Sequence, residues 1–199
     1  MLSNYKYIVE KLLEKLFRDY NFLSFFSPNL LTVLGLFFSL CILMVLEFFI
    51  FDPNTLLLII VFLILLSGLM DVLDGYVARR YNKVSNFGAF LDSTLDRISD
   101  AVYAYIFFKL NLVNDIFFLL LLTGFFLTSY SRARAEGIGI EMKGIGIVER
   151  SERILLIIGI LSIAFFNKTL SQYGIFILLL LTWISVFQRI LHVYTSTSK

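Results

Sequence analysis

Five long stretches of this chain contain no Asp, Glu, Lys or Arg, and they constrain the fold more than any other feature of the sequence. A helix that crosses a bilayer needs about 20 mostly apolar residues. Hydrophobic residues make up 59% of the chain and charged residues only 16%, whereas about 25% of the residues in soluble domains are charged. A soluble core of one domain's length has no room for so much apolar surface. The uncharged stretches are 20–46, 53–70, 116–131, 154–167 and 169–188.

The predicted fold class is an all-α integral membrane protein, with a single domain over residues 1–199. Ser27 or Asn29 can cap the first spanning helix, and Asp52 can cap the second, with Pro53 at the first helical position. None of the proposed spans contains an interior proline. We predict a bundle over 29–194 of six transmembrane helices, at about 29–51, 54–80, 87–110, 113–135, 149–167 and 170–194.

Residues 1–22 have a different pattern. Apolar side chains such as Val9, Leu12 and Leu16 repeat at helical spacing, and lysines and glutamates occupy the other face. This pattern predicts an amphipathic helix that lies on the membrane surface. A soluble helix that binds a partner protein is the alternative. We expect no signal peptide, because no short apolar segment with a small-residue cleavage site is present.

The distribution of Lys and Arg predicts orientation. These residues gather in the amino-terminal segment, in the connections 79–83 and 132–153, and at the carboxyl terminus. The positive-inside rule therefore places both termini and the charged clusters on the cytoplasmic side of a multi-pass protein of the cell membrane. With a net charge of only +2, we expect anionic headgroups or phosphorylated substrates as partners and no nucleic acid. Cys41 is the single cysteine, which excludes a disulfide.

Four aspartates lie near the cytoplasmic ends of two consecutive predicted helices. Asp71 and Asp74 are three residues apart, and Asp92 and Asp96 are four apart, so each pair shares one helix face. Because the connection is short, we expect the two helices to be antiparallel neighbours whose carboxylates converge in one cavity. Such carboxylates repel one another and resist desolvation, and intramembrane acids are usually functional. The cluster therefore predicts a divalent-cation site, and its all-oxygen ligands favour Mg²⁺, Mn²⁺ or Ca²⁺ over zinc.

Small residues beside the acids leave room for a bulky ligand. Gly75 and Ala78 follow the second aspartate, and Gly88 precedes the third. Arg79 offers paired planar donors that suit phosphate. Together with a metal, these residues fit a nucleoside diphosphate better than a bare ion. Helix packing and the positive-inside bias can explain the glycines and the arginine one by one, but they do not explain four acids.

The spacing of these residues resembles the signature of the CDP-alcohol phosphotransferase family at every fixed position. The upstream segment SPNLLTVLGL also resembles the first helix of that family, and the resemblance covers essentially the whole chain. Eight fixed residues make this a specific match. In this sequence the signature reads Asp71-x2-Asp74-Gly75-x2-Ala78-Arg79-x8-Gly88-x3-Asp92-x3-Asp96.

The resemblance implies an enzyme that transfers a phosphatidyl-type group from a CDP-linked lipid to an alcohol and releases CMP. It implies two divalent cations, Mg²⁺ or Mn²⁺, with Asp71, Asp74 and Asp92 as ligands and Asp96 as both ligand and catalytic base. It also implies a homodimer. The residues that it implies as CDP-lipid contacts are Asn29, Thr32, Gly75, Ala78, Arg79, Ser85 and Gly88.

A second basic region is similar to the branch of the family that uses inositol phosphate. The stretches SYSRARAEG and ERSER and an arginine on the last predicted helix carry this likeness. It implies 1L-myo-inositol 1-phosphate as the acceptor, and it leaves open whether the donor is CDP-archaeol or CDP-diacylglycerol. The residues implied to bind the acceptor phosphate are Arg132, Arg134, Arg150, Arg153 and Arg189. A solvated, positive-inside loop is the alternative reading of the same arginines.

The sequence also allows three functions other than an enzyme that uses inositol phosphate. The same chemistry with glycerol 3-phosphate or another alcohol as acceptor keeps the enzyme and changes only its substrate. A divalent-cation transporter also needs intramembrane acids, but its acids would be spread across the bilayer depth rather than gathered at one face. A purely structural scaffold would leave four close acids without compensation.

Overall fold

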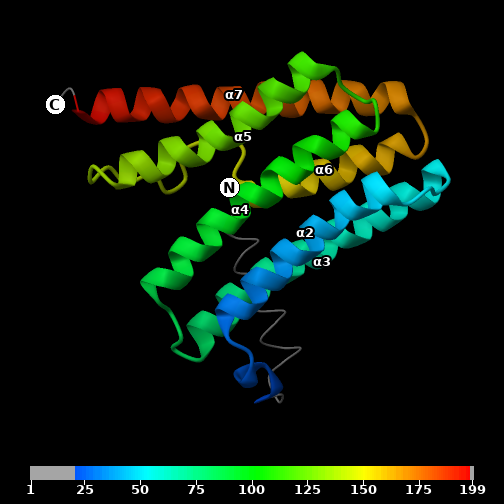
Figure 1. Cartoon of the computed structure of the whole chain (residues 1–199). Coiled ribbons are helices and arrows are strands. Elements are labelled where there is room, and N and C mark those ends of the chain that lie inside the picture. The colour runs from blue at the N-terminus through cyan, green and yellow to red at the C-terminus, as the bar shows by residue number, and fades with distance from the viewer. Residues whose placement is uncertain (1–20, 198–199) are drawn as a thin grey trace.

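A computed structural model of the protein describes residues 21–197, and every regular element in this range is helical (Figure 1). A short 3₁₀ helix precedes six α-helices. Their bounds are η1 Asn21–Phe25, α2 Pro28–Phe48, α3 Pro53–Arg80, α4 Asn86–Lys109, α5 Asp115–Glu136, α6 Arg150–Ala164 and α7 Lys168–Thr197.

The all-helical prediction is confirmed, and each of the six predicted helices has a counterpart close to its predicted bounds. Four of the described helices, α2, α3, α5 and α7, are long and apolar enough to cross a membrane. Helix α4 is 24 residues long but carries several charges, and α6 has only 15 residues. The structure therefore supports four candidate spans and does not show six. The predicted surface helix over 1–22 lies almost wholly outside the described residues.

Local chemistry fixes where the first helices begin. The Ser27 side chain accepts a hydrogen bond from the Leu30 amide at 3.2 Å, so Ser27 rather than Asn29 caps α2. Asp52 caps α3 in the same way, by accepting from the Thr55 amide at 3.0 Å. Each cap is followed by a proline at the first helical position, where the missing N–H has no intrahelical partner to lose.

The six α-helices form a closed ring. Going round it, α2 packs on α3, α3 on α6, α6 on α7, α7 on α5, α5 on α4, and α4 back on α2. Helices α3 and α4, which follow each other in the chain, thus both pack on α2. They meet each other through side chains such as Ser67 and Tyr103 and do not form the close antiparallel pair that the short connection predicted.

Small and apolar residues hold the ring together. A Cβ atom on Gly35 would lie only 3.4 Å from the Ser67 carbonyl oxygen, so this glycine lets α2 and α3 approach closely. The interior is filled by buried apolar side chains such as Ile64, Phe107 and Phe125. Large apolar side chains are exposed along the outer faces, as expected for helices that contact lipid. The chain also alternates direction, so the ends of α3, α5 and α7 lie with the starts of α2, α4 and α6 (Figure 1).

Candidate metal and nucleotide site

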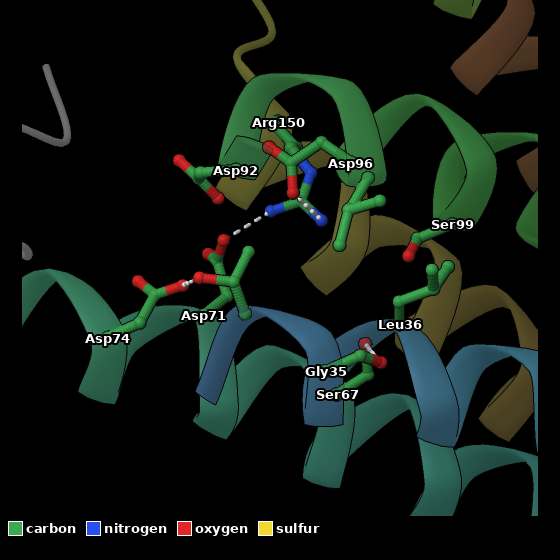
Figure 2. Close-up of a pocket in the computed structure, with 11 residues that line it drawn as sticks. Gly35, Leu36, Ser67, Asp71, Asp74, Asp92, Asp96, Ser99 and Arg150 are labelled. Carbon is green, nitrogen blue, oxygen red and sulfur yellow. Dashed lines mark hydrogen bonds and ion pairs between the residues drawn. The ribbon is translucent and has the colours of Figure 1, made fainter. Parts of the chain in front are cut away.

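A cavity opens at the end of the bundle where α3 ends and α4 begins. Four helices contribute to it: α2, α3, α4 and the first residue of α6 (Figure 2). In the close-up, acids from α3 and α4 face each other across the cavity, and a single arginine lies between them. The lining residues are Thr32, Gly35, Leu36, Ser67, Asp71, Asp74, Asp92, Leu95, Asp96, Ser99 and Arg150.

Three of the four predicted metal ligands form a compact group. Asp71 and Asp74 project from α3 and Asp92 from α4, and one carboxylate oxygen of each lies within 4.8 Å of the others. Oxygen ligands bind Mg²⁺ or Ca²⁺ at about 2.0–2.6 Å, so two ligands on opposite sides of one ion are about 4–5 Å apart. These three carboxylates therefore fit a hard divalent cation. Asp74 is buried, which makes a nearby positive charge all the more necessary.

Asp96 lines the same cavity, one helical turn deeper than Asp92. Its Oδ1 atom lies 2.7 Å from Nη2 of Arg150. Nη1 of the same guanidinium donates to Oδ1 of Asp71 at 2.8 Å. Arg150 thus bridges an acid of α3 and an acid of α4 from its position at the start of α6 (Figure 2). The structure gathers all four signature acids at one cavity, with three of them in the tight group and Asp96 beside it.

Thr32, an implied CDP-lipid contact, lies against the acid group itself. Its hydroxyl is 2.7 Å from Oδ2 of Asp74, and it also lies 3.1 Å from the Pro28 carbonyl oxygen. A donor to one oxygen of a metal-ligating carboxylate orients that carboxylate. The structure therefore places Thr32 as a residue that orients Asp74.

Three other implied CDP-lipid contacts meet at the start of α4. A Cβ atom on Gly88 would lie 3.0 Å from both Asn29 Oδ1 and Ser85 Oγ, so the absence of a side chain is what lets α2 and α4 come together here. Ser85 caps α4 by accepting from the Gly88 amide at 3.0 Å. On α3, a Cβ atom on Gly75 would lie 3.1 Å from Nη1 of Arg79, so that glycine leaves room for the guanidinium. Ala78 occupies the turn between these two residues.

The arginines implied to bind the acceptor phosphate are in three different settings. Arg150 lines the cavity. Arg153 and Arg189 are buried: Arg153 is paired with Asp100, and Arg189 donates to the carbonyl oxygens of Thr128 and Ile145. On α5, Arg132 forms an exposed ion pair with Glu136 at 2.9 Å, and Arg134 is exposed. The structure thus brings one of the five to the lining of the cavity.

Two features of the site were not predicted from the sequence. Asp100, 1% exposed, continues the row of acids on α4. Below the cavity, the buried hydroxyls of Ser39, Ser67 and Tyr103 hydrogen bond to one another at 2.9–3.2 Å and join α2, α3 and α4. The four-residue spacing from Asp96 to Asp100 was a visible signal for the first. Isolated hydroxyl residues in apolar helices were too weak a signal for the second.

Comparison with known proteins gives a consistent result. Residues 25–195 match the family described as CDP-alcohol phosphatidyltransferase. The chain is 39% identical over 191 residues to the archaetidylinositol phosphate synthase of Pyrococcus horikoshii, covering 96% of this chain and 95% of the relative. It is also 38% identical over 95 residues to the phosphatidylinositol phosphate synthase of Streptomyces avermitilis, covering 43% of this chain and 38% of the relative.

Solved structures agree with this result. The crystal structure of Mycobacterium tuberculosis phosphatidylinositol phosphate synthase with CDP-DAG bound superposes with a TM-score of 0.71 at 27% identity, covering 96% of this chain and 94% of the other. A crystal structure of the same mycobacterial protein in complex with manganese and citrate gives the same TM-score and identity, covering 96% and 89%.

Proposed function

We propose a function from one premise: the chain belongs to the CDP-alcohol phosphatidyltransferase family. It is accordingly an enzyme of phospholipid synthesis that moves a substituted phosphate group from a CDP-linked lipid to an alcohol. We propose that the alcohol is 1L-myo-inositol 1-phosphate and that CMP is the second product. The donor is CDP-archaeol or CDP-diacylglycerol.

One observation carries this proposal. Three carboxylates that fit a divalent cation lie in one cavity with a fourth acid and an arginine, all at the same end of the bundle. A transporter needs polar groups along a path through the bilayer, whereas the described acids of this cavity cluster at one end. The reaction needs a site of this kind, because its donor is half lipid and its acceptor is water-soluble.

The geometry supports different roles for different acids. Asp71, Asp74 and Asp92, with Asp96 beside them, would hold two divalent ions, Mg²⁺ or Mn²⁺. When bound, such ions neutralise the diphosphate and make CMP a better leaving group. The acceptor hydroxyl attacks the phosphorus next to the lipid, an oxygen–phosphorus bond forms, and the bond to CMP breaks. Asp96 takes the hydroxyl proton as general base.

The remaining residues position the two substrates. Asn29, Ser85 and Gly88 form the corner where α2 meets α4, and this corner admits the nucleotide end of the donor close to the backbone. Arg79, with Gly75 and Ala78 beside it, pairs with the donor diphosphate through its planar guanidinium, and Thr32 acts through Asp74.

The acceptor carries a second phosphate, and we propose that the arginine-rich side of the cavity recognises it. Arg150 lines the cavity directly, and the half-buried Arg132 and the exposed Arg134 lie at the end of α5. Relatives of this chain include synthases named for archaetidylinositol phosphate and phosphatidylinositol phosphate. Arg153 and Arg189 are buried, so they would contribute positive charge to the acceptor site from beneath its surface.

We further propose that the protein lies in the cytoplasmic membrane with the cavity and both termini facing the cytoplasm. In this arrangement α4 and α6 join the four candidate spans, so six helices cross the bilayer. Their polar residues then face the interior of the ring, where intramembrane charges are tolerated. A homodimer with two independent sites completes the proposed assembly.

An acceptor panel scored by CMP release tests the proposed function. The full chain, purified in detergent micelles, is mixed with CDP-diacylglycerol or CDP-archaeol and Mn²⁺ or Mg²⁺. The acceptors are myo-inositol 1-phosphate, glycerol 3-phosphate, free myo-inositol and serine. We expect CMP release with the inositol phosphate and none after chelation of the metal with EDTA. Release with glycerol 3-phosphate alone would overturn the acceptor, and Mn²⁺ flux through the protein in liposomes without CMP release would overturn the enzyme.

A further inference from the structure

A third carboxylate on α4 lies outside the family signature and below the cavity. Asp100 is four residues beyond Asp96, so it lies on the same helix face one turn deeper. It is 1% exposed and does not line the cavity. A carboxylate in that position is strongly disfavoured unless cations lie close to it.

Two arginines of α6 supply that charge. Nη2 of Arg153 lies 2.5 Å from Oδ2 of Asp100, and Nη2 of Arg150 lies 2.7 Å from Oδ1 of Asp96. Arg150 and Arg153 are three residues apart and therefore share one face of α6. Helices α4 and α6 face each other through two ion pairs. The upper rung, Asp96–Arg150, lies beside the cavity, and the lower rung, Asp100–Arg153, lies below it. We call these four residues the charge ladder.

A diagonal contact links the two rungs. Oδ1 of Asp100 lies 3.8 Å from Nε of Arg150. Both atoms are buried, and neither makes a hydrogen bond within the described part of the chain. Arg150 is thus attracted from two sides: towards Asp71 and Asp96 at the cavity, and towards Asp100 below it.

The lower rung is anchored to the rest of the ring. The Arg153 guanidinium lies over the Phe125 ring at 4.4 Å from its centroid and donates to Thr128 Oγ1 at 3.1 Å. The Thr128 carbonyl oxygen in turn accepts from Arg189, whose Nε donates to the Ile145 carbonyl at 3.0 Å. Arg153 is therefore held by α5, which Arg189 of α7 braces in turn, so Asp100 has a fixed lower partner, whereas Arg150 is shared among three carboxylates.

We propose that Asp100 is a positioning residue for the transfer reaction. In this structure Arg150 contacts Asp71 and Asp96, and the Asp100 carboxylate is the partner that would draw its guanidinium away when a cation binds to those acids. This inference rests on the proposed function, because it assigns Asp100 a role towards the cation site of that reaction. A buried ion pair gives little net stability compared with an apolar pair of the same size, so stability alone is a weak account of the ladder.

The proposal predicts opposite effects for the two members of the lower rung. In Asp100→Asn, Arg150 loses its lower partner and stays on Asp71 and Asp96, so Mn²⁺ binding weakens by about tenfold, as expected for a residue that acts on a metal site through its ligands. In Arg153→Gln, the ion pair with Arg150 is the one that Asp100 keeps among the described residues, and Asp100 draws that arginine down, so Mn²⁺ binds at least as tightly as to the parent chain. A merely structural ladder would weaken Mn²⁺ binding in both variants or in neither.

The experiment measures Mn²⁺ affinity by electron paramagnetic resonance on the full chain in detergent micelles, together with the thermal unfolding midpoint. Asp115→Asn, the same change at the exposed start of α5, is the matched control, and Asp100→Glu should restore parental affinity.

The double variant Asp100→Asn/Arg153→Gln should regain thermal stability, because neither charge is left unpaired, and should still bind Mn²⁺ weakly. Equal affinity losses in both single variants, or parental affinity in the double variant, would overturn the role of Asp100. A parent chain that binds no Mn²⁺ would instead overturn the proposed function, and the positioning role with it.

Discussion

The two ends of the bundle carry charges of very different kinds. At the end away from the cavity, Glu47 accepts from the Tyr105 hydroxyl at 2.5 Å and from Lys109 at 2.8 Å, and this ion pair joins α2 to α4 in an exposed setting. At the cavity end, Asp100 and Arg153 are almost fully buried. Water solvates the first ion pair, whereas the second depends on its partners alone.

The difference shows where the chain uses charge for chemistry. An exposed ion pair such as Glu47–Lys109 can be replaced with little loss of stability, because solvent screens its attraction. Half-buried acids that face one another are unfavourable without cations, so their presence at one end only indicates a function there. Matched substitutions at the two ends should therefore differ greatly in effect.

The largest effect is expected at a metal ligand. Asp92→Asn removes one charge from the three-carboxylate group, and CMP release should fall by about 10⁴-fold, because several kcal/mol of metal-ion stabilisation is lost. Asp115→Asn at the other end should retain parental turnover. The measurement is CMP release at saturating substrates, with circular dichroism as the check on folding. Comparable losses in the two variants would erase the distinction between the ends.

Removal of the proposed base should have the next largest effect. Asp96→Asn keeps the shape of the side chain but cannot accept the acceptor proton, so kcat should fall by about 10³-fold. Binding of Mn²⁺ and of CDP-diacylglycerol should persist, which separates this variant from Asp92→Asn. The measurement pairs turnover with equilibrium binding of the donor. Full turnover by this variant would refute the assignment of Asp96 as base.

A smaller effect is expected for a residue that orients a ligand. Thr32→Val removes the hydroxyl that lies 2.7 Å from Asp74, and Mn²⁺ affinity should weaken by about tenfold. Thr32→Ser keeps the hydroxyl and is the control. Isothermal titration of Mn²⁺ into both variants makes the comparison. If the valine and serine variants bind Mn²⁺ equally, the hydroxyl does not orient the carboxylate.

The smallest effect is expected at the exposed ion pair between Glu47 and Lys109. Glu47→Gln should change turnover by less than about twofold, because the ion pair with Lys109 is exposed to solvent. The thermal midpoint should move by no more than about 2 °C. A differential scanning measurement beside the turnover assay tests both values. A large loss of activity would mean that the far end couples to the cavity.

Much of the helical framework could be predicted from local sequence. Ser27 and Asp52 are caps that act within their own first turns, and each precedes a proline, so the starts of α2 and α3 depend on neighbours that the sequence displays. The spacings of Asp71 to Asp74 and of Asp92 to Asp96 likewise place each pair on one helix face, whatever the rest of the fold does. Local geometry of this kind is independent of tertiary packing.

The remaining features depend on long-range packing. The short connection predicted α4 beside α3, yet α4 packs more closely on α2, where Gly88 lets Asn29 of α2 approach. Nor could the sequence say that Arg150, 79 residues after Asp71, lies between α3 and α4. Its long side chain reaches the cavity only because α6 closes the ring beside α3.

Anomalous diffraction from crystals of the full chain grown with Mn²⁺ tests most directly whether the clustered acids are a cation site. The account predicts two anomalous peaks among the carboxylate oxygens of Asp71, Asp74, Asp92 and Asp96, at about the 2.0–2.6 Å expected for oxygen ligands of hard divalent cations. Manganese peaks only elsewhere on the protein, with these four carboxylates left without a cation, would contradict it.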